Sequence, residues 1–192
     1  MNEQQHRLND GTGVTIRPIR VGDEASNAAF VEALSPPSKH FLFLGGVPRM
    51  SADALQRLCD PEEGRDMAFV VFPSEGETRR QIGVCRYAGA TPKDGAEISI
   101  AVADDWQHKG LGKLLLQRLV EHARAHGIRR LYSMDAANNS HMRTLAKHFG
   151  FSERADSGDI RQVIYTLDIA PESEAGTREK QANSKEIPVK VA

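Results

Sequence analysis

The 192-residue sequence has little of several features that would place a chain in a specialised class of protein. It holds two cysteines, Cys59 and Cys85, without a C-x-x-C pair, which argues against a disulfide scaffold and favours reduced core thiols. Its 25 basic and 26 acidic residues leave a net charge of -1, so no basic field points to nucleic acid. No apolar run approaches the roughly 20 residues that cross a bilayer, and residues 1–10 are too polar for a secretory signal. These absences predict a cytoplasmic protein with neither nucleic acid nor membrane as a partner.

Both ends of the chain differ in composition from the middle. Residues 1–13 are polar, and residues 171–192 mix four basic with four acidic residues and hold no aromatic residue. Such segments cannot bury enough apolar surface to order themselves. We therefore expect disorder at 1–13 and 170–192 around one domain at 14–169, large enough to enclose a single core.

Within that domain the hydrophobic pattern predicts seven strands and four helices in the order β-α-α-β-β-β-α-β-α-β-β. Three β-rich runs at 66–72, 81–89 and 96–103 follow at short intervals, as in an antiparallel meander. A helix entered through Asp23 and a helix capped by Ser51 come before them, separated by a loop at 35–49. The remaining strands are expected at 14–19, 128–135, 151–156 and 161–169, and the remaining helices at 111–126 and 139–149.

Gly110 and Gly112 open the apolar helix that follows the third run of the meander. Each helical glycine costs roughly 1 kcal/mol relative to alanine, so a reason for the pair is required. A bare backbone around an anion would supply one, and a tight turn without a ligand would supply another. The spacing excludes two common phosphate motifs. A P-loop would need a hydroxyl residue after Lys113, where Leu114 stands, and a dinucleotide fingerprint would need glycine in place of Leu115.

The pattern Gln107-x-x-Gly110-x-Gly112 directly after a strand resembles the acetyl-CoA signature of the GNAT superfamily of N-acetyltransferases. Asn139 precedes Gly150-Phe151 at the distance typical of that family, and the order of the elements agrees. The resemblance covers residues 14–169 and is closest to the GNAT domain of Pat-type protein lysine acetyltransferases. It implies a GNAT-type α/β (α+β) fold, with a mixed, mostly antiparallel sheet of six to seven strands and about four flanking helices.

The resemblance also implies a function, namely direct transfer of an acetyl group from acetyl-CoA to a primary amine, in the first place a protein lysine. A small-molecule amine is the alternative acceptor, and a non-catalytic acyl-CoA-binding module is the alternative class. We expect acetyl-CoA as cosubstrate, no metal, and a monomer or homodimer. The cofactor-binding residues that the resemblance implies are Ile100, Ala101, Val102, Gln107, His108, Lys109, Gly110, Leu111, Gly112, Lys113 and Asn139.

Acetyl transfer to an amine requires that the amine lose its proton. A lysine with a pKa of about 10.4 is almost wholly protonated at neutral pH, so a general base accelerates the reaction. Glu97 is the candidate base, because alternation along its strand places it on the face opposite Ile98 and Ile100, and several GNAT enzymes carry a base there. An exposed strand glutamate without a role is the alternative.

Some family features have no clear counterpart in this sequence. Many members have a tyrosine acid seven residues after the asparagine, but that position is Ala146, so no general acid is assigned. Tyr132 and Tyr165 are expected to be sheet residues. His122 and His126 lie four apart on one helix and could ligate a metal, although a position near the helix end explains them too. Three residues of the loop at 35–49 are candidates for shaping the acceptor pocket: His40, Phe41 and Phe43.

Overall fold

The computed structural model describes residues 3–44, 51–75, 80–91 and 95–169. Within these ranges one eight-stranded sheet has the order β1-β2-β3-β4-β5-β6-β8-β7, and every neighbouring pair is antiparallel except β5–β6. The strands are β1 (Gln4–Arg7), β2 (Gly13–Pro18), β3 (Met67–Pro73), β4 (Gly83–Thr91), β5 (Gly95–Val102), β6 (Arg130–Ala136), β7 (Ser152–Ala155) and β8 (Gln162–Asp168).

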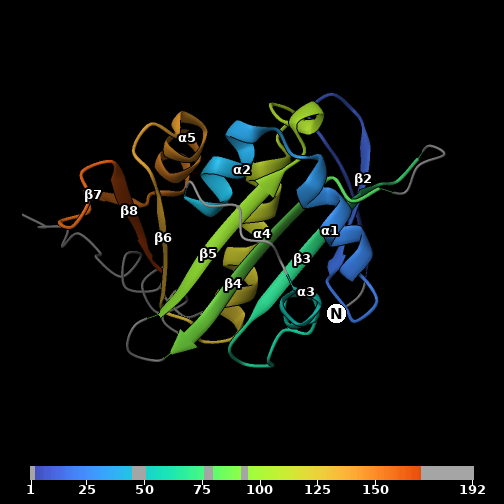
Figure 1. Ribbon diagram of the computed structural model, residues 1–192, viewed down its shortest axis with the longest axis horizontal. Coiled ribbons are helices and arrows are strands. Elements are labelled where there is room, and N and C mark those ends of the chain that lie inside the picture. The colour runs from blue at the N-terminus through green and yellow to red at the C-terminus, as the bar shows by residue number, and fades with distance from the viewer. Residues whose placement is uncertain (1–2, 45–50, 76–79, 92–94, 170–192) are drawn as a thin grey trace, which may run out of the picture.

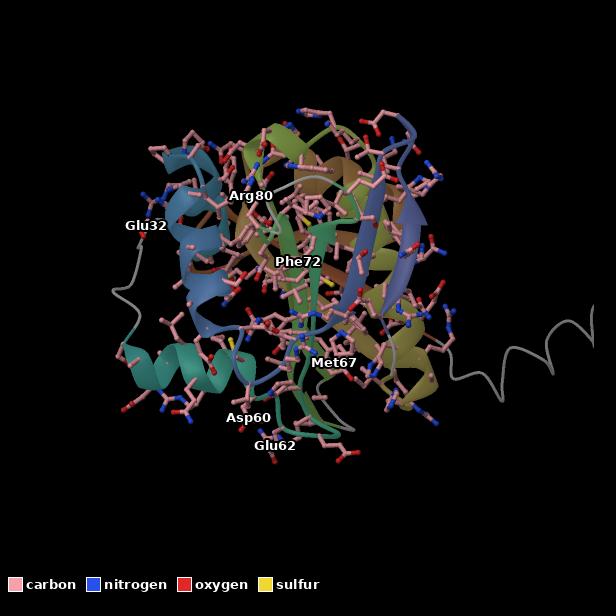
Figure 2. All side chains as sticks on the ribbon, turned by 90° about the vertical axis from the view of Figure 1, so that its right-hand side faces the viewer. Glu32, Asp60, Glu62, Met67, Phe72 and Arg80 are labelled. Atoms are coloured by element: carbon pink, nitrogen blue, oxygen red, sulfur yellow. The ribbon has the colours of Figure 1, made fainter. Side chains whose placement is uncertain are left out.

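Five α-helices lie on the two faces of this sheet (Figure 1). They are α1 (Glu24–Ala33), α2 (Pro36–Phe43), α3 (Ala52–Cys59), α4 (Leu111–Ala125) and α5 (Ser140–Phe149), with a 3₁₀ turn at Asp104–Trp106. Seen from the side, α1 and α3 lie on one side of the strands and α4 on the other (Figure 2). None of the helices in the described ranges is long and apolar enough to cross a membrane.

Helix α4 is the main support of the sheet and packs against β3, β4 and β5. Its leucines recur at helical spacing, and Leu111, Leu115, Leu116 and Leu119 are all buried. Gly83 on β4 has no side chain where α4 crosses, and an added Cβ would lie 3.2 Å from the Leu115 Cδ1 atom. Cys85 lies beneath the same helix, and Cys59 is buried as well, so both cysteines are free core thiols as expected.

The expected disorder before residue 14 is wrong for part of that segment. Gln4–Arg7 forms β1, which pairs antiparallel with β2 in the register Gln4↔Ile16 to Arg7↔Gly13. The side chains of β1 are mostly exposed, and backbone pairing to β2 holds the strand. A strand of this kind carries no hydrophobic period, which is why its sequence pattern indicates a loop.

The segment between the first two expected helices is also more ordered than predicted. Pro36–Phe43 forms α2, with Pro36 at the first helical position and the Ser35 hydroxyl accepting from the Ser38 amide at 3.3 Å. Two consecutive prolines suggest a loop, yet proline suits a helix start because the amide that it lacks has no partner there. The fold therefore has one strand and one helix more than predicted.

The start of α1 corrects a further detail. Asp23 is its N-cap residue, but its carboxylate makes no capping bond. It instead accepts two hydrogen bonds of 2.7 Å from the Arg17 guanidinium and one of 2.9 Å from the Arg20 amide. The Arg17 guanidinium holds the pKa of Asp23 below its usual value. Ser51, in contrast, caps α3 as expected, with its hydroxyl accepting from the Ala54 amide.

Candidate active site

The sheet opens between its two parallel strands. Strands β5 and β6 pair only at Ala96↔Leu131 and Glu97↔Tyr132, after which no further pairs join them, so that they form a wedge. Beyond Glu97, β5 stays paired with β4 as far as Val102. The edge of β5 that faces β6 therefore presents backbone groups without a strand partner from Ile98 to Val102, and those groups can bind an extended ligand.

Gly95 brings the two strands together at the closed end of this wedge. Its φ of +84° is left-handed, and a Cβ atom built on it would lie 2.4 Å from the Arg130 carbonyl oxygen. No side chain fits in that space, because real Cβ atoms do not approach backbone oxygen so closely. Glycine here fixes how near β5 and β6 can come, and so fixes where the wedge begins.

The N-terminus of α4 lies at the open end of the wedge, directly after the 3₁₀ turn that follows β5. The amides of Leu111, Gly112 and Lys113 have no carbonyl one helical turn earlier to bond, and they carry the positive end of the helix dipole. A Cβ on Gly112 would meet no atom within 4 Å, so the space in front of this turn is open. Such an open turn of free amides suits a phosphate group.

Gly110 has a different reason to be glycine. Its φ is +89°, and a Cβ there would lie 2.9 Å from the Asn9 amide nitrogen, in the turn between β1 and β2. The Asn9 backbone amide also donates to the Lys109 carbonyl at 3.4 Å. The N-terminal hairpin therefore supports the loop before α4, a contribution that sequence reasoning missed because it assigned residues 1–13 to disorder.

The two lysines of the loop have separate surroundings. The Lys109 ammonium lies 3.5 Å from the Asp10 carboxylate and 4.8 Å from the centre of the Trp106 ring. Lys113 is exposed on the first turn of α4, and within the described ranges no carboxylate pairs with it. Of the two, Lys113 has the ammonium that is available to a phosphate.

Gln107 connects the end of β5 to α2. Its side-chain amide donates to the Val102 carbonyl and to the Ser38 hydroxyl, both at 3.3 Å. Asp104 strengthens this connection by accepting from the Ser35 amide, the Ser35 hydroxyl and the Ser38 hydroxyl at 2.6 to 2.9 Å. Although partial burial opposes it, these bonds lower the pKa of Asp104. The contacts hold α2, and with it His40, Phe41 and Phe43, beside the wedge.

Glu97 is exposed and occupies the last paired position before the strands diverge. It lies on the face opposite Ile98 and Ile100, as its strand pattern predicts. Paired residues share a face, so Ile100, opposite Cys85, points toward α4, and Glu97, opposite Ala88, points to the side of α1 to α3. Tyr132 lies next to Glu97 on β6, on the same face. A carboxylate is thus available to an amine that approaches from that side.

Asn139 begins α5 on the far side of the wedge. Its side-chain oxygen accepts from the Met142 amide at 3.1 Å, and its side-chain nitrogen donates to Asp135 at 3.0 Å. The asparagine is buried, with 8% of its surface exposed. Burial raises the pKa of the Asp135 carboxyl, although the bonds from Asn139 and the Ala136 amide oppose that shift. Asn139 therefore acts as the helix cap that its position alone predicts.

One contact crosses the open end of the wedge. The rings of His108, in the loop before α4, and His141, in the first turn of α5, meet edge to face with centres 4.8 Å apart. His108 adopts a left-handed φ of 62°, which is unusual for a residue other than glycine. His141 carries no motif and was missed from the sequence, because nothing in the spacing places the two segments together.

The remaining candidates are structural. Ala146 is 1% exposed and packs in the core, and Tyr132 and Tyr165 stand on β6 and β8 as predicted. His122 and His126 stack with ring centres 3.9 Å apart near the end of α4, and the Tyr87 hydroxyl lies 3.0 Å from the His122 Nδ1 atom. Within the described residues no group of three or more side chains could hold a metal ion.

Comparison with known proteins agrees with this geometry. The family model described as the acetyltransferase (GNAT) family matches residues 37–151. A curated acetyltransferase of Pseudomonas aeruginosa is 38% identical over 160 residues, which cover 83% of this chain and 86% of the relative. The mycothiol acetyltransferase of Thermobifida fusca is 29% identical over 126 residues, and the match spans only 38% of that protein.

Solved structures give the same result. The GNAT domain of S. lividans PAT is 26% identical, with a TM-score of 0.76 over 87% of this chain and 97% of that domain. RimL, a ribosomal L7/L12 alpha-N-protein acetyltransferase solved with coenzyme A, shares the fold with a TM-score of 0.63 at 17% identity. The chain therefore belongs to the GNAT family of acetyltransferases, which use acetyl-CoA as the acetyl donor.

Proposed function

We propose that the protein transfers the acetyl group of acetyl-CoA directly to the side-chain amine of a lysine in a protein. The observation that carries this proposal is the position of Glu97, exposed at the closed end of the wedge on the face away from α4. The donor and the amine can then approach the reacting carbon from opposite faces of the sheet.

The donor is proposed to bind through the backbone. The amides of residues 108–113 would surround its pyrophosphate, the bare Gly112 leaves room for that group, and Lys113 adds a charge-assisted contact. The pantetheine arm would lie in the wedge against the main chain of Ile100, Ala101 and Val102. Asn139 would contact the pantetheine arm from the α5 side. One of its two side-chain N–H groups donates to Asp135, and the other would donate to the arm.

The chemistry needs a proton acceptor and a polarised carbonyl. Glu97, directly or through one water, would take the proton of the attacking amine. A main-chain N–H near Ala101 or Val102 would donate to the thioester oxygen as charge develops on it. A thiol with a pKa of about 8.5 leaves as thiolate without a strong acid, so the reaction can proceed with alanine at position 146.

Access to Glu97 favours a macromolecular acceptor over a small one. Glu97 itself is exposed, and the cavity between α1 and α3, lined by Ala25, Ala28, Leu55 and neighbouring residues, is a separate feature of the fold. On the Glu97 face the adjoining strands carry exposed side chains, including Met134 and Arg154. A long lysine side chain on a protein surface can reach such a site, whereas a small amine gains few contacts there.

Glu97→Gln tests the proposal, with Glu32→Gln as the matched control because Glu32 is exposed on α1 (Figure 2). With acetyl-CoA and a lysine peptide, we expect Glu97→Gln to lower kcat roughly a hundredfold at neutral pH while the calorimetric Kd for acetyl-CoA stays near that of the wild type. The deficit should shrink as pH rises, because more of the amine is then already neutral.

Two results would contradict the proposal. Wild-type kcat in Glu97→Gln near pH 7 would show that Glu97 is not the base. Turnover of small amines, such as polyamines or amino-sugar derivatives, without turnover of lysine peptides would assign the acceptor to the small-molecule class, to which the mycothiol acetyltransferase belongs.

A further inference from the structure

The two walls of the wedge differ on the side that faces α4. Alternate residues of a strand share a face, so one set of side chains from each wall points to this side. They are Ile98, Ile100 and Val102 on β5, and Leu131, Ser133 and Asp135 on β6. Ile98 is 2% exposed, whereas Ile100 and Val102 are partly exposed, so the β5 wall opens where the strands part. That wall is apolar, and the β6 wall carries a hydroxyl and a carboxyl group.

The Asp135 carboxylate is hydrogen-bonded at one of its oxygens only. Its Oδ1 atom accepts from the Ala136 amide at 2.7 Å and from the Asn139 side chain at 3.0 Å. Among the residues that the structure describes, none donates to its Oδ2 atom, although the residue is only 8% exposed. A carboxylate shielded from water in this way is costly unless donors surround it. Asp135 therefore lacks a donor that a ligand could supply.

Ser133 stands two residues earlier on the same wall and is in a similar state. It is 6% exposed, and its hydroxyl makes no hydrogen bond within the described ranges. Two residues of a strand span about 6.7 Å, so the hydroxyl and the carboxylate form a short polar row along the wedge. Both residues come after Tyr132, the last residue of β6 that pairs with β5. The row therefore lies where the two strands have already parted.

This polar row lies between the start of α4 and the candidate base. Asn139 bonds Asp135, so the carboxylate lies beside the start of α5. The histidine contact across the open end of the wedge joins that helix start to the loop before α4. Glu97 lies at the other end, in the last pair before the strands part. A ligand that extends from the start of α4 to Glu97 therefore passes Asp135 first and Ser133 second.

The pantetheine arm of coenzyme A carries two amide groups in series, so it offers N–H donors and carbonyl acceptors along an extended chain. We infer that Ser133 and Asp135 bind this arm from the β6 side of the wedge. The Asp135 Oδ2 atom accepts from the N–H of the amide nearer the pyrophosphate, and the Ser133 hydroxyl bonds the amide nearer the thioester. The inference rests on the proposed placement of the donor in the wedge, and it adds two side chains to the main-chain groups of β5.

Asp135→Asn tests the unpaired oxygen alone. The asparagine oxygen can keep the bonds from Ala136 and Asn139, which are both donors, so its NH₂ group takes the place of Oδ2. Calorimetry gives the Kd for acetyl-CoA and for adenosine 3′-phosphate 5′-diphosphate, which has the phosphates of coenzyme A but no arm. For acetyl-CoA we expect Asp135→Asn to raise Kd roughly tenfold and Ser133→Ala roughly threefold, because hydrogen bonds to charged groups are the stronger ones. The Kd for the nucleotide without the arm should not change in either variant.

The nucleotide without the arm separates binding of the arm from a structural role. Equal losses for both ligands would show that Asp135 acts only through the start of α5, and unchanged or tighter binding of acetyl-CoA to Asp135→Asn would also overturn the inference. If Asp135→Asn does not fold, the same comparison on Ser133→Ala decides. Asp53→Asn, at an exposed position in the first turn of α3, is the control and should change neither Kd. A wild-type protein that does not bind acetyl-CoA would overturn the proposed donor site as well.

Discussion

Gly110 and Gly112 differ in what their missing side chains make possible. Gly110 is held in a left-handed conformation against Asn9, so its glycine belongs to the fold. Gly112 faces open space in the first turn of α4, so no contact with the described residues requires a glycine there. Its role at the proposed phosphate site stays a prediction. The sequence motif presents the two as one signature, and only the three-dimensional contacts separate them.

A series at Gly112 tests this separation. Gly112→Ala should leave the melting temperature equal to or above that of the wild type, because alanine favours a helix and the added Cβ meets no atom. Gly112→Gln should weaken acetyl-CoA binding through bulk, and Gly112→Glu should abolish it through bulk and negative charge. Calorimetry on the folded variants measures both effects. Equal affinity in Gly112→Glu would exclude this turn as the phosphate site.

His122 makes the stability of the protein depend on pH. Burial, together with the nearby His126 and Arg118, lowers the pKa of His122 from 6.5 to about 4. Between these values the unfolded chain binds a proton that the folded chain does not. The free energy of unfolding therefore falls as pH drops through this window, by up to about 1.4 kcal/mol per pH unit.

Urea titrations at pH 7 and pH 5 measure this loss. We expect His122→Asn, which keeps a group able to bond the Tyr87 hydroxyl, to show a smaller loss between the two pH values than the wild type. His148→Asn, at an exposed position in the last turn of α5, is the control and should keep the full loss. Equal losses in all three proteins would assign the pH dependence to other groups.

At the scale of the elements, the hydrophobic period of the sequence predicted the helices and strands that are stabilised by burial of their side chains. Strands β2 to β6, strand β8 and helices α1, α3, α4 and α5 lie where alternation or helical spacing placed them, because each buries side chains in a common core. The side chains of β7 are exposed, and this strand lies within the expected range 151–156. Strand β1 and helix α2 could not be found in this way. Backbone pairing holds β1, and hydrogen bonds to Asp104 and Gln107 hold α2.

The same distinction applies to the candidate site. The places of the glycine loop and of Glu97 in the fold could be predicted, because each occupies a fixed position along one strand or turn, and their roles stay predictions. The contacts of Asn9 with the loop and of His108 with His141 join segments that are far apart in the chain, and no local pattern carries that information.

The close approach of β5 and β6 at the closed end of the wedge predicts that a substitution at Gly95 lowers stability and acetyl-CoA affinity. Gly95→Ala must move either β5 or β6, because its Cβ would lie 2.4 Å from the Arg130 oxygen. Gly89 is also left-handed, but a Cβ there meets no atom within 4 Å, so Gly89→Ala isolates the cost of backbone strain. We expect both variants to lose about 1–2 kcal/mol from strain, and Gly95→Ala to lose more and also to bind acetyl-CoA less tightly. Equal stability and affinity in the two variants would contradict this account of the wedge.

At the scale of the whole molecule, the balanced composition of residues 171–192 predicts that this segment does not contribute to the core. Ending the chain after Ala170 should leave the affinity for acetyl-CoA unchanged and the melting temperature within about 2 °C, which corresponds to under about 1 kcal/mol for a chain of this size. Scanning calorimetry measures the change. A larger fall would show that the segment packs on the fold.

Because only two residue pairs join β5 to β6, the sheet consists of two blocks of strands that are weakly connected. Strands β1 to β5 come from residues 4–102 and pair in chain order, and α4 packs on them, while β6, β8 and β7 come from residues 130–168. The pairs β1–β2, β3–β4, β4–β5 and β7–β8 close short loops, so we expect pairing within each block to form early and docking of the blocks to come last. Native-state hydrogen exchange should then show one cooperative unit for each block, with the second opening at lower free energy. The unpaired stretch between β5 and β6, where we propose that acetyl-CoA binds, is therefore also the place where we expect unfolding to begin.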